Sequence, residues 1–187
     1  MLLLVAGCAP AARSELPSLA EPSATAVVSA GPAAPAAQRA ADEPDAGGVR
    51  GTFRGQSFQS KVALARRDAR DAAGGFSVWI FDADATCDNL GDPMANSSIT
   101  VRKLPADTRF LSAHVPWQTG AKLEVADYNA GFHYVDGDGN ELGGGAQSGV
   151  IEVIEAATDP GAKAKVRVAV KGKDSDLSGT LELTVCP

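Results

Sequence analysis

Apolar and basic side chains alternate over residues 163–171, with Ala169 as the exception, and this feature constrains the fold of the chain more than any other. Successive side chains of a β-strand point to opposite faces, so a period of two predicts a strand with one face in a hydrophobic core and one in solvent. The positions expected to face inward are Ala164, Val166, Val168 and Val170, and those expected to face solvent are Lys163, Lys165, Arg167 and Lys171.

The same period returns in residues 177–185. Only Gly172 to Asp176 separates the two segments, and so short a connection predicts an antiparallel hairpin. We interpret Gly179, inside the second segment, as the position of a β-bulge. The side chains expected to face inward are Leu177, Leu181, Leu183 and Val185, and those expected to face solvent are Ser178, Thr180, Glu182 and Thr184.

From Val49 onward, short apolar runs alternate with Gly, Asp and Pro at intervals of about ten residues. This spacing predicts an all-β domain over residues 49–187, either an antiparallel β-sandwich or a partly open barrel of about eight to nine strands. Residues 76–81 are apolar on both faces, which predicts a central strand that is covered on each side.

The other expected strands are less sharply marked. Residues 61–73 suit a helix by composition, but the alternation of Val62 and Leu64 favours a strand followed by a loop. Asp136 to Gly139 is a tight-turn sequence, because Asp and Gly tolerate positive φ. The remaining candidate strands are Gly51–Phe58, Ser98–Lys103, Arg109–Val115, Lys122–Ala126, Gly131–Val135 and Gly149–Glu155.

An apolar leader ends in Val5-Ala6-Gly7-Cys8, which resembles the lipobox of bacterial lipoproteins. The resemblance implies that a signal peptidase cleaves before Cys8 and that the thiol of Cys8 carries a lipid. We interpret residues 1–7 as the end of a signal peptide whose start lies upstream, because a positively charged segment is missing and the apolar stretch is short.

Residues 8–48 are rich in Ala, Pro and Ser, and they are too poor in large apolar side chains to form a core. We expect a disordered tether with a root-mean-square reach on the order of 35 Å. By resemblance to other lipoproteins, Ala9 directly after the anchor indicates the outer membrane, while the side on which the domain lies stays open. The expected location is therefore the bacterial cell envelope.

If Cys8 carries a lipid, Cys87 and Cys186 are the two cysteines left over. In an oxidising compartment such a pair predicts a disulfide. Two alternatives stay open, which are two free thiols and a zinc site that recruits His114 or His133. Both histidines are expected on strand faces.

Residues 78–86 resemble the first motif of haloacid-dehalogenase-like phosphatases, in which a hydrophobic strand delivers two aspartates. The resemblance implies that Asp82 attacks phosphorus, that Asp84 protonates the leaving group and that Asp138 helps to hold Mg²⁺. That family needs strands that alternate with helices, whereas residues 86–135 contain Pro, Gly and short β-like runs. A metal-dependent phosphatase is therefore the alternative hypothesis.

Asp136, Asp138 and Asn140 have the spacing of the first three ligands of a calcium loop. Glu141 stands where the sharp turn of an EF-hand needs Gly, and Gln147 stands where the bidentate Glu is needed. An EF-hand is therefore excluded, and a loose calcium site competes with a simple hairpin turn.

The net charge of −6 argues against a nucleic-acid partner, because such binding depends on neutralising phosphates with Lys and Arg. With only His114 and His133 in the chain, no Ser-His-Asp set is evident, and neither a catalytic residue nor a cofactor is assigned. The first hypothesis is therefore a lipid-anchored, non-enzymatic binding or structural module. Its expected partners are the membrane, through the lipid, and an envelope protein, a glycan or a small ligand.

Overall fold

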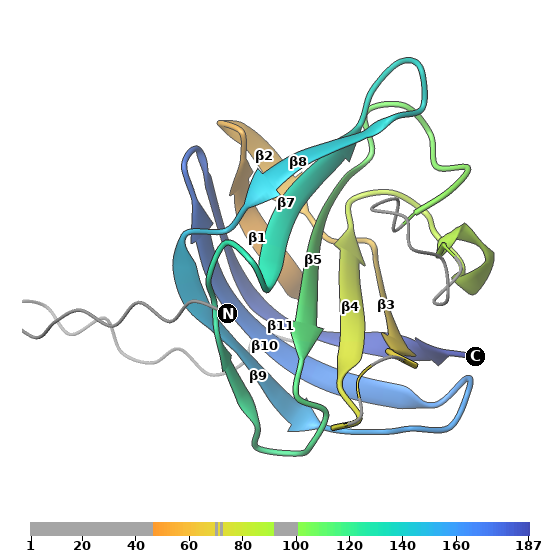
Figure 1. Ribbon diagram of the computed structural model, residues 1–187. Coiled ribbons are helices and arrows are strands. Elements are labelled where there is room, and N and C mark those ends of the chain that lie inside the picture. The colour runs from red at the N-terminus through yellow and green to blue at the C-terminus, as the bar shows by residue number, and fades with distance from the viewer. Residues whose placement is uncertain (1–46, 70, 72, 92–100) are drawn as a thin grey trace, which may run out of the picture. The chain divides into compact units, whose positions relative to one another are not determined.

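The strands of this chain form one mixed sheet that curls into a half-barrel (Figure 1). The computed structural model describes residues 47–69, 71, 73–91 and 101–187. The strands are β1 (Gly48–Phe53), β2 (Gln56–Gln59), β3 (Val62–Arg67), β4 (Phe76–Phe81), β5 (Arg109–Val115), β6 (Lys122–Glu124), β7 (Ala130–Val135), β8 (Glu141–Gly145), β9 (Ser148–Glu155), β10 (Lys163–Gly172) and β11 (Ser175–Cys186).

The predicted all-β class is confirmed. Neighbouring strands follow the order β6-β9-β10-β11-β3-β4-β5-β7-β8, and β1 joins this path at β11 and pairs with β2. In the described ranges the one helical element is the 3₁₀ turn η1 (Cys87–Asn89), and no helix there has the length and apolar character needed to cross a membrane.

β11 divides one of its edges between two neighbours. Gly48 of β1 lies opposite Thr180 in the N-terminal half of β11, and Leu64 of β3 lies opposite Thr184 near its end. The pairing with β3 is parallel, whereas β1 runs antiparallel to β11. The other edge of β11 pairs with β10 along its length. The sheet therefore branches at β11, and Val49 of β1 packs into the main core.

Two hydrophobic cores lie on the two faces of β4. Phe76, Val78 and Ile80 point into the main core inside the curl. Trp79 and Phe81 point to the outer face, into a smaller second core. The prediction of a central strand covered on both faces is confirmed. The other buried members of the second core are Leu64, Leu90, Val101, Phe110, Val135 and Cys186.

The predicted disulfide is confirmed. Cys87 in η1 is bonded to Cys186 at the end of β11, with 5.5 Å between their Cα atoms and a sequence separation of 99 residues. The bond ties the segment after β4 to β11, and both cysteines contact the second core. Closing so long a loop stabilises the fold by about 2–4 kcal/mol, mainly by restricting the unfolded chain.

The hairpin of β10 and β11 is also confirmed, with Gly172 opposite Ser175 and the predicted apolar positions buried. The predicted bulge at Gly179 is wrong, because the register continues unbroken through that residue. Gly179 has φ +141°, and a Cβ there would lie 2.3 Å from the carbonyl oxygen of Gly48. Thr180, expected in solvent, is buried where β1 begins beside it.

Two further predictions need correction. Residues 51–58 form two strands rather than one, because Arg54 and Gly55 both have positive φ and make the tight turn between β1 and β2.

The strand β8 was not predicted, because its three glycines have low β-propensity. The turn at Asp136 brings β8 against β7 and so sets their pairing. The turn itself, and the strand and loop within residues 61–73, are as predicted.

Several predictions fall on residues outside the described part. They include the leader with Val5-Ala6-Gly7-Cys8, the tether up to residue 46, and the first half of the strand predicted at Ser98–Lys103. Of that strand, Val101 forms an isolated bridge with Leu90.

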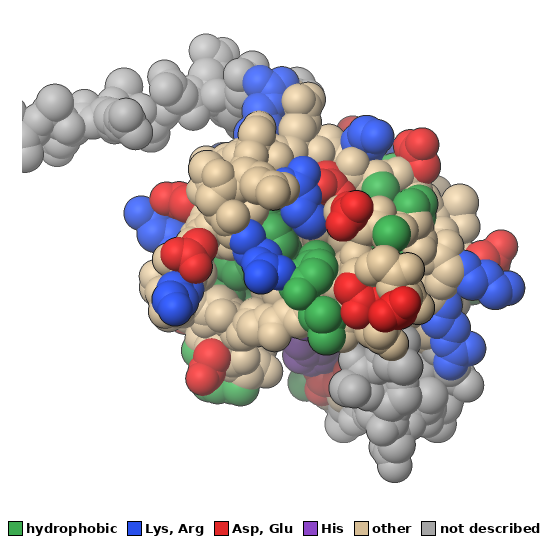
Figure 2. Space-filling model, turned by 90° about the horizontal axis from the view of Figure 1, so that it is seen from above, with side chains coloured by type: hydrophobic (Ala, Val, Ile, Leu, Met, Phe, Trp, Pro, Cys, Tyr) green, Lys and Arg blue, Asp and Glu red, His purple; other side chains and the backbone are tan. Residues whose placement is uncertain are grey.

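The face of the domain in Figure 2 carries basic and acidic side chains side by side, with hydrophobic side chains between them. Two of the four basic side chains of β10 have acidic partners. Arg167 Nη1 lies 2.9 Å from Glu152 Oε2, and Lys171 Nζ lies 3.3 Å from Asp176 Oδ2. The charge of this strand is thus partly neutralised by its neighbours in the sheet.

Candidate functional site

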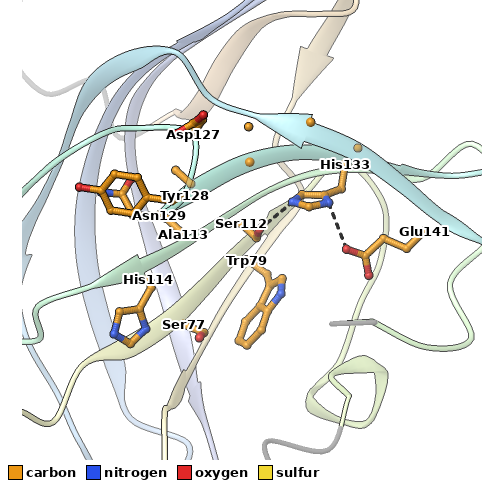
Figure 3. Close-up of a pocket in the computed structure, with 15 residues that line it drawn as sticks. Ser77, Trp79, Ser112, Ala113, His114, Asp127, Tyr128, Asn129, His133 and Glu141 are labelled. Atoms are coloured by element: carbon orange, nitrogen blue, oxygen red, sulfur yellow. Dashed lines mark hydrogen bonds and ion pairs between the residues drawn. The ribbon is translucent and has the colours of Figure 1, made fainter. Parts of the chain in front are cut away.

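The outer face of β4, β5, β7 and β8 carries an open pocket of about 460 Å³ (Figure 3). It lies beside the second core, and Trp79 borders both. Polar side chains and the glycines of β8 make its wall, so the pocket combines hydrogen-bonding groups with flat backbone. The polar and aromatic side chains that line the pocket are Ser77, Trp79, Ser112, His114, Asp127, Tyr128, Asn129, His133 and Glu141.

One hydrogen bond and one ion pair run diagonally across three strands of this face. Ser112 Oγ on β5 lies 2.9 Å from His133 Nε2 on β7, and His133 Nδ1 lies 3.0 Å from Glu141 Oε1 on β8 (Figure 3). The sheet register explains the contacts, because Phe110 lies opposite His133 and Val135 lies opposite Glu141. Ser112 and Glu141 are therefore the diagonal neighbours of His133, within reach of its side chain.

The partners of the His133 imidazole assign its tautomer. Nδ1 faces Glu141, and an ionised carboxylate only accepts hydrogen bonds, so we assign the ring proton to Nδ1. Nε2 then accepts the hydrogen bond that the Ser112 hydroxyl donates. In this alignment a histidine can act as a base toward a serine hydroxyl.

The position of the imidazole is fixed by an aromatic ring and by two glycines. The ring of Phe110 stacks on it, with 5.0 Å between centroids and 12° between planes. A Cβ at Gly131 would lie 2.6 Å from Nε2, and a Cβ at Gly143 would lie 2.6 Å from Nδ1. Glycine at both positions therefore leaves the space in which the imidazole lies across the sheet.

Two groups beside the imidazole are withdrawn from water. Only 8% of the Glu141 side chain is exposed. The indole Nε1 of Trp79 is buried and has no hydrogen-bond acceptor among the described residues. Trp79 lies opposite Ser112 in the ladder of β4 and β5. A buried donor without an acceptor costs about 1–3 kcal/mol, so the fold keeps an unfavourable group next to the serine.

The rim of the pocket is the turn between β6 and β7. Asn129 holds this turn, because its Oδ1 accepts from the backbone N–H of Ala126 at 2.8 Å and its Nδ2 donates to the carbonyl of Glu124 at 3.0 Å. The turn presents Asp127 and Tyr128 to the pocket, and 87% of the Tyr128 surface is exposed.

The second histidine of this face has different partners. His114 Nε2 lies 3.0 Å from Asp71 Oδ2, and His114 Nδ1 lies 3.8 Å from Asp68 Oδ2. Hydrogen bonds from the backbone N–H groups of Ala73 and Gly75, together with the contact to His114, lower the pKa of Asp71. His114 thus ties the segment after β3 to β5, and both its nitrogens face carboxylates.

Protein-family models, curated proteins and solved structures give no match to this chain. The site is therefore interpreted from its own side chains.

The residues predicted as calcium ligands lie in the turn between β7 and β8. Asp136 Oδ1 accepts hydrogen bonds from the backbone N–H groups of Asp138 and Asn140, at 2.9 and 2.8 Å, and the Asn140 amide donates to both its oxygens. These bonds lower the pKa of Asp136. The carboxylate thus serves the turn, and calcium binding stays a prediction. No cluster of three His, Cys, Asp or Glu side chains that suits a metal occurs in the described residues.

The aspartates of the phosphatase resemblance are not gathered around the pocket. Asp82 directly follows β4, and 11% of its side chain is exposed. Its Oδ2 lies 2.6 Å from Arg109 Nε, and its Oδ1 accepts from the Arg109 backbone N–H at 2.8 Å. Asp84 lies two residues further on, in the segment that leads to η1. Asp138 lies in the turn between β7 and β8. The all-β fold also differs from the alternating strands and helices that the resemblance implies.

The set of Ser112, His133 and Glu141 was not predicted from the sequence. The turn at Asp136 fixes the register of β7 and β8, so the contact between His133 and Glu141 could have been predicted if β8 had been recognised as a strand. The contact with Ser112 could not have been predicted, because β5 pairs with β7 while β6 lies between them in sequence.

Proposed function

We propose that this chain is a lipid-anchored protein of the bacterial cell envelope whose β-domain binds a saccharide in the outer-face pocket. The observation that carries the binding role is the meeting of aromatic and polar side chains in one open pocket. Pockets that bind small molecules combine apolar surface with a few convergent polar groups.

A saccharide suits this combination better than an apolar ligand. Pyranose rings present C–H faces to aromatic side chains, and their hydroxyls both donate and accept hydrogen bonds. Tyr128 offers an aromatic ring in solvent at the rim, which is an unfavourable place for a large ring unless something covers it. Asp127 and Ser77 offer hydrogen-bonding groups around the same opening.

Two features support an exported, anchored chain. The Cys87–Cys186 disulfide is typical of an oxidising compartment outside the cytosol. The lipobox resemblance at Cys8, followed by the expected tether, supplies an anchor and a spacer between the membrane and the domain.

The binding role is tested by NMR titration of the full chain with the trimers of glucose and N-acetylglucosamine at millimolar concentrations. We expect the Trp79 indole and Tyr128 signals to shift, and Tyr128→Ala to weaken binding about tenfold, which corresponds to roughly 1.4 kcal/mol. Leu142→Ala is the control, because Leu142 is exposed and lies outside this pocket. The proposal fails if neither trimer shifts the pocket signals, or if Leu142→Ala weakens binding as much as Tyr128→Ala.

The anchor is tested by the intact mass of the protein recovered from membranes. We expect a chain that begins at Cys8 and carries added lipid, and we expect Cys8→Ala to release the protein from the membrane fraction. A mature chain that begins at Met1 without lipid would contradict the anchor and leave the binding role untouched.

A further inference from the structure

We propose that Ser112 is a nucleophile that accepts the acyl group of a carboxylic ester, with His133 as its general base and Glu141 as the residue that positions His133. This activity goes beyond the binding role proposed above. It depends neither on the lipid anchor nor on a saccharide ligand.

Ser112, His133 and Glu141 stand in the order of a catalytic triad. A catalytic triad is recognised by its geometry and roles rather than by sequence position: a serine hydroxyl bonds one imidazole nitrogen, and a carboxylate bonds the other. Ser112 Oγ is hydrogen-bonded to Nε2 at 2.9 Å, and Glu141 Oε1 is ion-paired with Nδ1 at 3.0 Å, so the three groups stand in this order. The tautomer assigned to His133 gives Nε2 the free electron pair that a base needs.

His114, on the same face of the sheet, has different partners from His133. Both nitrogens of His114 face carboxylates, those of Asp71 and Asp68, so neither is directed at a hydroxyl nucleophile. Ser112 and His133 both line the pocket, where an ester that enters from solvent can reach the hydroxyl. Trp79, which also lines the pocket, lies opposite the same serine in the ladder of β4 and β5.

The imidazole of His133 is held in one position by its neighbours in the sheet. The stacked ring of Phe110 and the missing side chains at Gly131 and Gly143 keep it across the sheet, toward Ser112 on one side and Glu141 on the other. A side chain at either glycine would displace the ring from its partners, so the two glycines permit this arrangement of the imidazole. Preorganisation of this kind lowers the reorganisation that a proton transfer requires.

The reaction balances with water as the second substrate. Ser112 Oγ attacks the carbonyl carbon while its proton moves to His133 Nε2, and His133 returns that proton to the leaving alkoxide, which departs as an alcohol. Water then attacks the acyl-serine ester and gives its proton to His133. The carboxylic acid leaves, and Ser112 takes the proton back. The open pocket of about 460 Å³ suits esters with short acyl groups such as acetyl.

The test is covalent labelling of the full-length chain with a small alkyl fluorophosphonate. The expected product is a phosphonyl adduct on Ser112, with loss of fluoride. Trypsin releases Ser112 in the peptide 110–122, where Thr119 is the other hydroxyl residue, while Ser77 falls in the peptide 71–102. Fragmentation of the labelled peptide therefore identifies the site without any variant.

Variants then separate a reactive serine from a merely exposed one. Ser112→Ala removes the adduct and the hydrolysis of p-nitrophenyl acetate, and His133→Gln slows labelling about 100-fold or more. Ser77→Ala is the matched control, because Ser77 lines the same pocket on β4, and it labels like the parent chain. Gly131→Ala pushes the imidazole from Ser112 and slows labelling about tenfold while every reacting group is retained.

The positioning role of Glu141 has its own readouts. Glu141→Gln removes the charged acceptor at Nδ1, so the downfield proton signal of that N–H disappears and labelling slows about tenfold or more. Glu141→Asp restores part of both. A purely structural Glu141 would change the melting temperature without this linked loss and rescue.

Three results would overturn the inference: no adduct on the parent chain, an adduct elsewhere than Ser112, or labelling that His133→Gln leaves unchanged. Saccharide titration and labelling of the parent chain distinguish the two proposals. Binding without labelling refutes the nucleophile and keeps the binding role, and labelling without saccharide binding does the reverse.

Discussion

The outer face of the sheet has a covered half and an open half, and both are built from the same strands. Along β4 the outward side chains change from Phe81 through Trp79 to Ser77, and along β5 they change from Phe110 through Ser112 to His114. The apolar ends belong to the second core, and the polar ends line the pocket. A strand whose outward face turns polar partway along thus marks where the cover ends and a site can begin.

Phe110 joins the two halves, so its removal should have the largest effect. Its ring lies 5.3 Å from that of Phe81 and 5.0 Å from the imidazole of His133. We expect Phe110→Ala to lower the free energy of unfolding by about 3–5 kcal/mol, because it opens a cavity in a buried site. Urea denaturation measures this loss, with exposed Leu142→Ala as the control. A loss below about 1 kcal/mol would mean that the second core does not hold the site.

Loss of the disulfide should act on the covered half first. We expect Cys87→Ala with Cys186→Ala to cost about 2–4 kcal/mol of unfolding free energy, since the unfolded chain loses a long closed loop. Hydrogen exchange should speed up at Leu90 and Val101 well before it does at the pocket strands. A reducing agent should destabilise the parent chain and leave the double variant unaffected; equal effects on both would contradict this prediction.

The Asp82–Arg109 pair should rank third. Arg109→Leu leaves the Asp82 carboxylate nearly buried beside an apolar side chain, and we expect a loss of about 1–3 kcal/mol in unfolding free energy. The control is Arg167→Leu, which breaks a more exposed pair with Glu152 and should cost less than about 1 kcal/mol. Equal losses in the two variants would show that the burial of Asp82 contributes nothing.

Asp71, on the open half, should give the smallest effect. Its pKa in the folded chain lies below 3.8, so it stabilises the fold above the ordinary carboxyl range and loses this contribution as the pH falls through the lowered value. Melting temperatures between pH about 5 and pH about 2 should therefore fall less steeply in Asp71→Asn than in the parent chain. Parallel curves would exclude this contribution.

The sequence was informative where a pattern is local. The period of two in residues 163–171 identified β10, and the apolar residues 76–81 identified a strand covered on both faces. The disulfide followed from assigning Cys8 to a lipid. The turn of Arg54 and Gly55 and the glycine-rich β8 were missed, because backbone conformation and pairing overrode what their composition suggests.

The candidate site depends on contacts between strands that the sequence does not bring together. Ser112 and His133 meet because β5 skips β6 to pair with β7. Each residue by itself has an ordinary place on a strand face, and only the register gives it a partner. Non-local pairing therefore decides the chemistry here, which is why the set was not predicted.

The branching of the sheet at β11 has a consequence for folding speed. Gly48, at the start of the described chain, pairs with Thr180, and Leu64 pairs with Thr184. Neither β1 nor β3 can complete its pairing before β11 arrives from far along the chain, so the fold has a high contact order and should form slowly. During that delay, β1 and β3 expose unpaired edges, and the chain is most exposed to aggregation then.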